Sequence, residues 1–430
     1  MRAFPRRASA VLAAALASAL SLTACGSDAG SDAASASGKV EGPITFQTWN
    51  LRATFKDYFN GLIDEFEKKY PGTEVKWVDR PAEGYADKIS ADAAGGTLPD
   101  VVNVSPDLAA PLAKAGLALD LDQAAAEYRE EYLPGAWKSH RIPGLEGTYA
   151  FPWYLNTGPM FYNKRLFGQA GLDASEPPAT YGELFDAALD IARKSDSKVA
   201  TLANVPTIED FGRYGVRTMN GEGTAFTFND AKGVELLQHY KKLYDAGALD
   251  SQALTATPES SGRKFLTESV AMNPGSAHDL DTFKKQAPGL YKNIGITDMV
   301  TNTGKNNMYV MGVMVNASGK NKPAAVAFAH FVTDAKHQEE FAREVAIFPS
   351  TAGSLDDAYF TEDDGTEDGR VRVAAAKSLK DAVNYTPVLF SEQMKTELRN
   401  AVARALQGKQ SAKAALDNAV TACNRLLRQS

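Results

Sequence analysis

The first part of the chain alternates between strand-like and helix-like hydrophobic patterns. Apolar residues recur at helical spacing over 55–70, and a second helical run over 85–94 stops at Gly95-Gly96. Three β-rich runs surround these helices: ITFQTW (44–49), EVKWV (74–78) and DVVNV (100–104). This order predicts a mostly parallel sheet with right-handed crossovers, in which ligands meet the carboxyl ends of the strands. The loops expected there are Trp49–Arg52, which includes Asn50, and Ser105–Asp107.

The rest of the chain continues with mixed α and β patterns. TYGELFDAALDIARK begins with Thr180 and Glu183, the pair of a capping box, followed by an apolar stripe at helical spacing. Further helices are predicted over 230–246, 323–346, 373–383, 391–407 and 411–427, and strands over 158–163, 269–273 and 308–315. A chain of this length exceeds one ordinary core, so two domains are expected. No internal repeat is apparent.

The N-terminus has the pattern of an export signal. Arg2, Arg6 and Arg7 precede an uncharged run over 8–22, which is too short for a typical membrane span. Cys25, one of two cysteines, follows Leu22-Thr23-Ala24. This arrangement resembles a bacterial lipobox, which implies cleavage before Cys25 and attachment of two acyl chains to it. Residues 1–24 are therefore the expected signal peptide.

A stretch of Gly, Ser, Ala and Asp follows at 26–42, and it is expected to be a flexible tether behind the lipidated Cys25. The whole chain has a formal net charge of −7, which becomes more negative when the arginines of the leader are removed. That balance argues against a nucleic-acid partner. Cys423 has no partner for a disulfide and is expected on a helix face.

Common catalytic and metal-binding motifs are absent from the sequence. It has no GxSxG, GxxxxGK[ST], GxGxxG or HExxH pattern, and none of its five histidines pairs at metal-ligand spacing. The acidic stretch over 361–369 does not fit an EF-hand loop. We therefore expect neither an enzyme nor a bound metal or cofactor, although paired carboxylates for glycan cleavage remain an alternative.

Aromatic residues beside polar ones supply the candidate binding site. FPWYLN (151–156) places Trp153 near Asn156, and IEDFGRYG (208–215) places Phe211 near Glu209. Flat rings stack on the apolar faces of sugars, while carboxylates, amides and arginine bind the hydroxyls, which is typical of pockets with a few placed polar groups. Core packing is the alternative interpretation of these rings.

Landmarks spread along the chain resemble a known family. They are ITFQTWN, IDEFEKKYPGTEVKWV, ADAAGGTLPDVVNVSPD, YAFPWYLNTGPMFYNKRLFGQAGL, PPATYGELFDAA, SVAMNPGSAHD, VMGVMVNASGKNKPAAVAFAHFVT and AIFPS. In this order they resemble the extracellular solute-binding lipoproteins of bacterial ABC importers, in the carbohydrate-binding family that includes maltose-binding protein. The resemblance implies a monomeric sugar binder, anchored by lipid at the outer face of the cell membrane, that delivers its ligand to a membrane permease.

The resemblance also implies a periplasmic-binding-protein-like α/β fold of type II topology, with two lobes that close over the ligand about a multi-crossing hinge. Crossings are expected near 155–161, 307–314 and 348–351. The expected first lobe is 43–155 with 313–347, and the expected second lobe is 156–312 with 348–430.

Site residues carry over from the family unevenly. Trp49, Asn50 and Arg52 would border the cleft, Asp107 falls at a sugar-binding acidic position, and Asn156 replaces a carboxylate. Glu209 and Phe211 match an acidic–aromatic pair, and Phe390 lies near a stacking position. Ser276 stands where the family has a stacking tryptophan, a departure for which His278 could compensate.

Other ligands of the same fold remain open at this stage. A sugar phosphate or glycerol phosphate would need arginine or lysine clusters, of which the candidates offer only Arg52 and Arg213. A polyamine would need several carboxylates between aromatic rings, and Glu209, Asp210, Asp107 and Asp279 allow it. A ferric ion would need several tyrosines with carboxylates or histidine.

Overall fold

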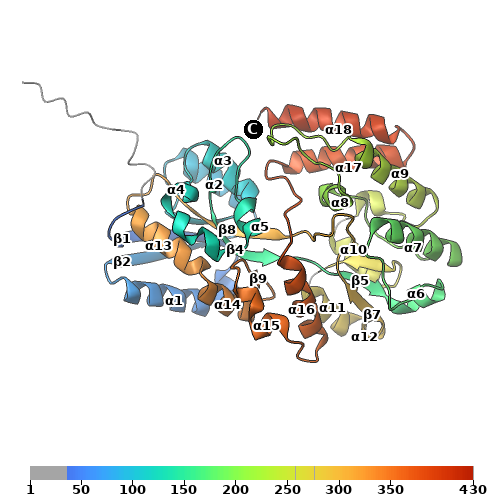
Figure 1. The fold of residues 1–430 in the computed structure, drawn as a ribbon, viewed down its shortest axis with the longest axis horizontal. Helices are drawn as coiled ribbons and strands as arrows, with labels where there is room; N and C mark the ends of the chain where they lie inside the picture. Colours follow the sequence, from blue (N-terminus) through green and yellow to red (C-terminus); the bar gives the residue numbers. More distant parts are fainter. Residues whose placement is uncertain (1–35, 257, 276, 430) are drawn as a thin grey trace, which may run out of the picture.

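The chain folds into two α/β lobes that lie side by side (Figure 1). The computed structural model describes residues 36–256, 258–275 and 277–429. The predicted signal peptide, Cys25 and most of the tether lie outside the described residues, as does Ser276. Within the described ranges, no helix is both long enough and apolar enough to cross a bilayer.

One lobe is built on a six-stranded sheet with the order β2-β1-β3-β8-β4-β9. β1 pairs in parallel with β2 and β3, whereas β3, β8, β4 and β9 pair antiparallel in turn. The predicted parallel arrangement is therefore found only among the first three strands, because β8 runs opposite to β3. The strands are β1 (Gly42–Trp49), β2 (Thr73–Arg80), β3 (Val101–Val104), β4 (Phe151–Asn156), β8 (Tyr309–Val315) and β9 (Phe348–Pro349).

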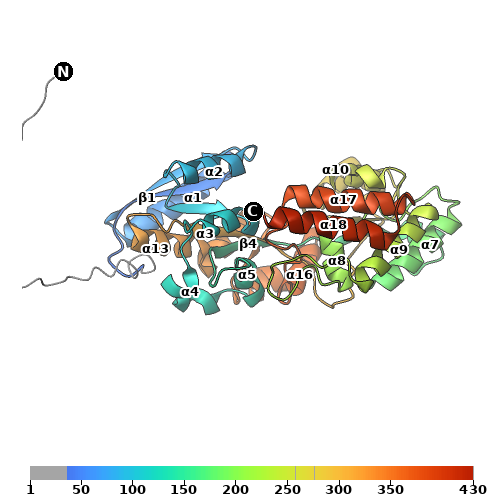
Figure 2. The same ribbon diagram turned by 90° about the horizontal axis from the view of Figure 1, so that it is seen from above.

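Helices cover both faces of this sheet. The aromatic side chains of α1 and α13 pack with Phe46 and Trp153 on one face, and α2 and α3 pack with Val102 and Val104 on the other. Figure 1 shows α2 and α3 above the strands of this sheet and α1 below them, and Figure 2 shows the same lobe from above. The helices of this lobe are α1 (Arg52–Lys69), α2 (Tyr85–Ala94), α3 (Pro106–Lys114), α4 (Leu121–Ala124), α5 (Pro134–Ser139), α13 (Lys322–Thr333) and α14 (Ala335–Glu344).

The single helix predicted over 323–346 is in fact two helices. Asp334 has extended backbone angles and caps α14, since its side chain accepts a hydrogen bond from the His337 N–H. The side chain of a capping aspartate accepts a hydrogen bond from the backbone of the helix that follows. This bond competes with continuation of the preceding helix. The hydrophobic pattern runs through this break because both helices contribute side chains to the same first-lobe core cluster.

The other lobe is mostly helical around a three-stranded sheet with the order β6-β5-β7. Its strands are β5 (Met160–Asn163), β6 (Met272–Pro274) and β7 (Ile294–Thr297). The predicted capping box is present at the start of α7, where Thr180 and Glu183 exchange hydrogen bonds with the backbone. The helices are α6 (Lys164–Gln169), α7 (Tyr181–Lys194), α8 (Ile208–Tyr214), α9 (Ala231–Asp245), α10 (Pro258–Leu266), α11 (Ala277–Gln286), α12 (Pro288–Tyr291), α15 (Ala358–Thr361), α16 (Glu367–Leu379), α17 (Glu392–Leu406) and α18 (Ala412–Leu427).

Two strand-to-strand connections pass between the sheets. β4 of the larger sheet is followed by β5 of the smaller one, and β7 of the smaller sheet is followed by β8 of the larger one. After β9 the chain leaves the larger sheet again for α15 and α16. The predicted lobe boundaries at 312 and 348 divide β8 and exclude β9, yet both strands lie wholly in the larger sheet. The structure thus moves these two boundaries to the strand ends.

The lobe with the six-stranded sheet buries His140 completely, and this burial makes its stability depend on pH. Burial lowers the pKa of His140 to about 3. In the unfolded chain the pKa is near 6.5, so on acidification the unfolded state binds the proton first and is favoured. Between pH 7.5 and 5 we expect this group to remove about 2 kcal/mol from the free energy of unfolding.

Urea unfolding of the wild type and of His140→Gln at both pH values checks this expectation. The variant should be less stable overall, but it should lack this part of the pH dependence. Equal pH dependence in the two proteins would mean that His140 does not titrate as its burial requires.

Candidate functional site

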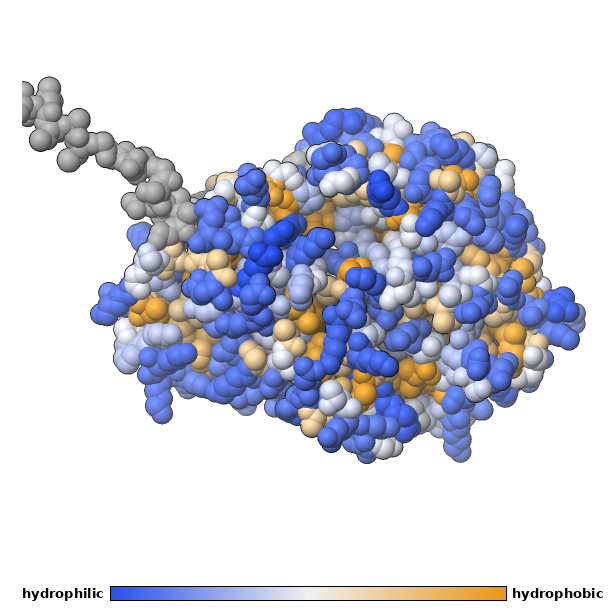
Figure 3. All heavy atoms as spheres, viewed as in Figure 1, coloured by the Kyte–Doolittle hydropathy of each residue, from blue (hydrophilic) through white to orange (hydrophobic). Residues whose placement is uncertain are grey.

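A cavity lies where the crossing segments meet. It has a volume of 190 Å³, and we call it the inner cavity. One wall belongs to the larger sheet and is formed by Tyr309, at the start of β8. The other walls come from the second lobe. Its lining residues are Met160, Leu184, Leu202, Asn204, Thr207, Glu209, Asp210, Arg213, Tyr240, Pro274, Met299, Val300 and Tyr309. Figure 3 shows the hollowed surface between the two lobes near the centre of the view.

The short helix α8 places three charged side chains at this cavity. Thr207 and Asp210 form a capping box at its start, and Gly215 ends it with a left-handed φ of 93°. Phe211 points into the second-lobe core, which leaves Glu209 and Arg213 one turn apart on the cavity side. The local sequence thus fixes both the helix ends and the face that meets the cavity.

Arg213 and Asp210 form a buried ion pair beside the cavity. Their nitrogen and oxygen are 2.6 Å apart, and Arg213 is only 5% exposed. The Tyr181 hydroxyl donates to the same Asp210 oxygen over 2.8 Å. Burial alone would lower the pKa of Arg213, but Tyr181 and Asp210 raise it above its ordinary value, so the guanidinium keeps its charge. Its Nε and Nη1 have no hydrogen-bond partner among the described residues.

Glu209 is held by a segment that also contacts the hinge. The Thr386 hydroxyl donates to Glu209 Oε1 over 2.5 Å. Thr386 belongs to residues 383–390, which we call the strap. Backbone hydrogen bonds join Val383 to Asn306 and Met308, just before β8. Gly212 is needed here, because a Cβ atom at that position would lie 2.5 Å from the Tyr385 ring.

The strap reaches both lobes. Phe390 packs against Phe226 in the second-lobe core, with ring centroids 5.4 Å apart. Val388 and Leu389 pack instead against the first-lobe cluster that includes Tyr85 and Ile142. A change in the angle between the lobes must therefore move the strap relative to one of them.

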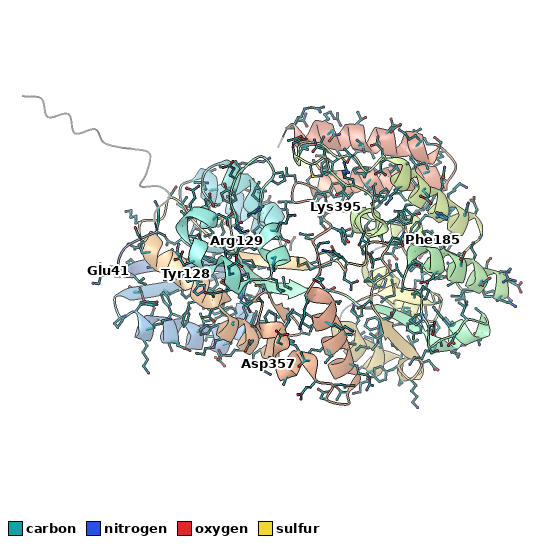
Figure 4. All side chains as sticks on the ribbon, in the orientation of Figure 1. Glu41, Tyr128, Arg129, Phe185, Asp357 and Lys395 are labelled. Atoms are coloured by element: carbon teal, nitrogen blue, oxygen red, sulfur yellow. The ribbon has the colours of Figure 1, made fainter. Side chains whose placement is uncertain are left out.

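A second cavity adjoins the inner one. This outer cavity has a volume of 230 Å³ and shares Thr207 and Glu209 with the inner cavity. Its other lining residues are Val205, Pro206, Ile208, Phe390, Lys395, Leu398 and Arg399. Figure 4 labels Lys395, which lies at the end of α17 nearest the first lobe. The lining of the outer cavity therefore has two basic side chains against the shared Glu209, whereas the inner cavity has two carboxylates and one guanidinium.

Another cavity, of 250 Å³, lies between the end of α14 and the helices α15 and α16. Its arginines are already engaged: Arg343 pairs with Asp357 at 2.8 Å and Arg372 with Asp364 at 3.0 Å. Both guanidinium groups also lie over the Tyr359 ring. We prefer the inner cavity as the candidate site because its buried arginine has unused donors.

Three of the predicted stacking rings lie in the cores. Trp153 is 1% exposed and stacks on Phe341 in the first lobe. Phe211 and Phe390 are buried in the second lobe beside Phe228. The structure therefore contradicts a role for the Trp153 and Phe211 rings in stacking on a sugar, because the surrounding side chains cover their faces. Phe390 contributes only to the lining of the outer cavity.

None of the predicted first-lobe residues is among the lining residues of the inner or the outer cavity. Trp49 is half-buried and stacks on Tyr85 at 5.3 Å, and Asn50 beside it is exposed with a left-handed φ of 54°. Asp107 is exposed at the start of α3. Arg52 does not point to the cleft, because its guanidinium donates to the Trp77 carbonyl and covers the Trp77 ring.

Among the remaining predicted residues, Asn156 lies beside a lining residue but is not itself among the lining residues of either cavity. It is exposed at the end of β4 and pairs with Tyr309 across the sheet. Asp279 is partly buried on α11 and is not among the lining residues of either cavity. Ser276 and the side chain of His278 lie outside the described part of the structure. The described residues contain no group of three or more metal-ligand side chains arranged for an ion.

Sequence reasoning missed Tyr309 and Asn204. Tyr309 is 54% exposed, although it begins a strand whose other residues are mostly buried. An aromatic residue at the first position of a predicted crossing strand, directly after a polar loop, was the available signal. Asn204 lies in a loop without a motif, so only the fold brings it to the cavity.

The crossing next to the cavity depends on a glycine at position 158. A Cβ atom there would lie 2.3 Å from the Gly275 carbonyl oxygen, and backbone cannot rotate away as a side chain can. We expect Gly158→Ala to destabilise the protein by about 1–3 kcal/mol in urea unfolding, because the crossing must shift. Gly168→Ala is the control, since the space around a Cβ atom is open there. A neutral Gly158→Ala would show that the crossing is less tightly packed than its contacts indicate.

Comparison with known proteins gives a consistent set of matches. The model of the family described as bacterial extracellular solute-binding protein matches residues 52–339. The sn-glycerol-3-phosphate-binding periplasmic protein UgpB of Brucella melitensis is 23% identical over 309 residues, covering 68% of this chain and 70% of that protein.

Solved structures match over nearly the whole chain. The cyclic alpha-maltosyl-1,6-maltose binding protein from Arthrobacter globiformis has a TM-score of 0.74 at 20% identity, covering 91% of this chain and 100% of that one. The sugar-binding protein MalE from Xanthomonas citri has a TM-score of 0.73 at 20% identity, covering 90% and 98%. At these identities the likeness establishes the two-lobed fold.

Proposed function

Because the chain belongs to the bacterial extracellular solute-binding protein family, we propose that it binds a sugar between its lobes and delivers it to an ABC importer. The observation that carries this proposal is the inner cavity, in which Tyr309 from the larger sheet faces Asn204, Glu209 and Arg213 from the second lobe. A ligand in contact with both walls stabilises their approach, so binding favours the closed arrangement of the lobes.

The chemistry of the lining supports a sugar. Met160, Pro274 and Val300 supply apolar surface, and the polar groups are few and distinct. A sugar hydroxyl both donates and accepts hydrogen bonds, which suits a carboxylate and a guanidinium on one wall. Relatives of the same fold are named as sugar-binding proteins.

A phosphorylated polyol is the second candidate ligand. It is favoured by the relatives named as binding sn-glycerol 3-phosphate and by the basic lining of the outer cavity, Lys395 and Arg399. Lys395 is already 2.6 Å from Glu392, which reduces its availability to a phosphate. We therefore place the sugar first.

The wider account rests on the sequence. Lipidation at Cys25 would hold a monomeric binding protein at the outer face of the cell membrane, with residues 26–42 as the tether, and the permease would recognise the closed form. The lobes would be 43–156 with 309–349, and 160–297 with 358–429. Catalysis is not part of the proposal; release of product from any bound glycan would contradict it.

Thermal unfolding against a ligand panel tests the proposal. The panel holds uncharged mono- and oligosaccharides, sugar phosphates, glycerol phosphate, polyamines and ferric ion. A ligand at 100 times its dissociation constant adds about 2.7 kcal/mol to the free energy of unfolding, which shifts the midpoint by several degrees. We expect an uncharged sugar to produce the shift; a shift with only a polyamine, a phosphate or iron would contradict the sugar assignment.

A further inference from the structure

The inner cavity contains a positive group whose charge is already balanced. Arg213 is paired with Asp210 at 2.6 Å, and it is only 5% exposed. The pair still has hydrogen-bond donors to offer, since Arg213 Nε and Nη1 have no partner among the described residues. Leaving a buried donor unpaired is costly, so a ligand oxygen that reaches this side chain gains affinity. The guanidinium thus acts as a donor without attracting anions strongly.

Glu209 is the unbalanced charge of the same cavity. Its hydrogen bond comes from the neutral hydroxyl of Thr386, and none of the ion pairs between described residues includes it. The lining residues therefore carry one guanidinium against two carboxylates, and the field in the cavity is negative.

We infer that the inner cavity selects an uncharged hydroxyl-bearing unit and excludes anions, with Glu209 as the residue that sets this preference and Arg213 as a charge-balanced donor. The inference rests on the proposed function and specifies its ligand class. A hydroxyl donates to Glu209 and accepts from Arg213, which satisfies both groups. A phosphate or carboxylate meets repulsion from Glu209, and a cation offers Arg213 no acceptor.

The isosteric change Glu209→Gln tests the inference with inorganic phosphate as the probe. Calorimetric titration at low ionic strength, where screening is weak, compares the wild type with the variant. Removal of the negative charge should tighten phosphate binding about tenfold or more, because charges a few ångströms apart interact strongly in a partly dry cavity. Glu176→Gln, an exposed glutamate outside both cavities, is the matched control and should bind phosphate as the wild type does.

A variant that fills the inner cavity distinguishes phosphate binding there from phosphate binding in the outer cavity. Asn204 lines only the inner cavity, so Asn204→Trp added to Glu209→Gln should abolish the gain. A gain that persists in the double variant would assign the phosphate to the outer cavity and overturn the inference. Unchanged phosphate affinity in Glu209→Gln would overturn it as well.

The same titrations keep this inference distinct from the proposed function. If an uncharged sugar binds the wild type but Glu209→Gln gains no phosphate binding, the inference fails and the sugar-binding function stands. If no sugar binds but the phosphate results are as expected, the function fails and the charge preference stands. Wild-type binding of a sugar phosphate as tightly as of the matching sugar would contradict the inference.

Discussion

Replacing Arg213 with methionine is expected to lower the free energy of unfolding by about 3–5 kcal/mol. The change removes the partner of Asp210 and leaves a mostly buried carboxylate beside the Tyr181 hydroxyl. An unpaired buried charge is far costlier than a broken surface pair. Urea unfolding monitored by circular dichroism measures the loss, and for a lobe of this size it corresponds to a fall in Tm of roughly 10 °C.

The matched control for this prediction is Arg399→Met. Arg399 is an exposed arginine that lines the outer cavity, and its replacement should change stability by less than about 0.5 kcal/mol. The double variant Arg213→Met with Asp210→Asn should lose less than Arg213→Met alone, because it no longer buries an unpaired charge. A loss below about 1 kcal/mol in the single variant would show that water reaches the pair.

Replacing Tyr309 with alanine is expected to weaken sugar binding about 30-fold or more and to leave stability nearly unchanged. Tyr309 is 54% exposed, so it contributes little to the core, yet it forms the first-lobe side of the inner cavity. Aromatic residues at the centre of a binding site account for much of its free energy. Titration of the sugar identified in the panel, with thermal unfolding of the free protein, measures both quantities.

Two further variants make this prediction specific. Tyr309→Phe keeps the ring and should lose much less affinity than the alanine variant. Trp153→Ala should behave in the opposite way, with a loss of about 3–5 kcal/mol in stability, because its ring is in the core. If Trp153→Ala folds stably and loses sugar affinity while Tyr309→Ala does not, the assignment of these two rings is wrong.

The elements that local patterns determine could be predicted from the sequence. The capping box of Thr180 and Glu183 begins α7, and the predicted helices over 391–407 and 411–427 agree with α17 and α18 within one residue at each end. These helices have caps and amphipathic stripes that act over one or two turns. The family resemblance, which covers nearly the whole chain, gave the two-lobed α/β fold.

The residues that face the cavity could not be predicted in the same way. Trp153 and Tyr309 are both aromatic residues in strands near a crossing. They differ in that a helix covers the Trp153 ring, whereas Tyr309 is exposed. α14 places Phe341 on the Trp153 ring, a contact between segments far apart in the sequence. Sequence spacing carries no information about such covering, so a core ring and a binding ring look alike.

Charge balance is likewise a property of the folded chain. The sequence IEDFGRYG contains two acidic residues and one arginine, but it does not show which carboxylate forms the ion pair with the arginine. Arg213 pairs with Asp210, which also accepts from the Tyr181 hydroxyl, and Glu209 keeps only its hydrogen bond from Thr386 of the strap. The electrostatics of the site therefore follow from the packing of α7, α8 and the strap.

Calorimetric titration of one uncharged sugar into the wild type, Tyr309→Ala and Asn204→Ala tests the central claim most directly. These two residues line the inner cavity from different lobes. If the sugar is bound between the lobes, each variant should bind it at least about tenfold more weakly while unfolding at nearly the same temperature as the wild type. Full affinity in either variant would mean that only one lobe holds the sugar and would contradict the account.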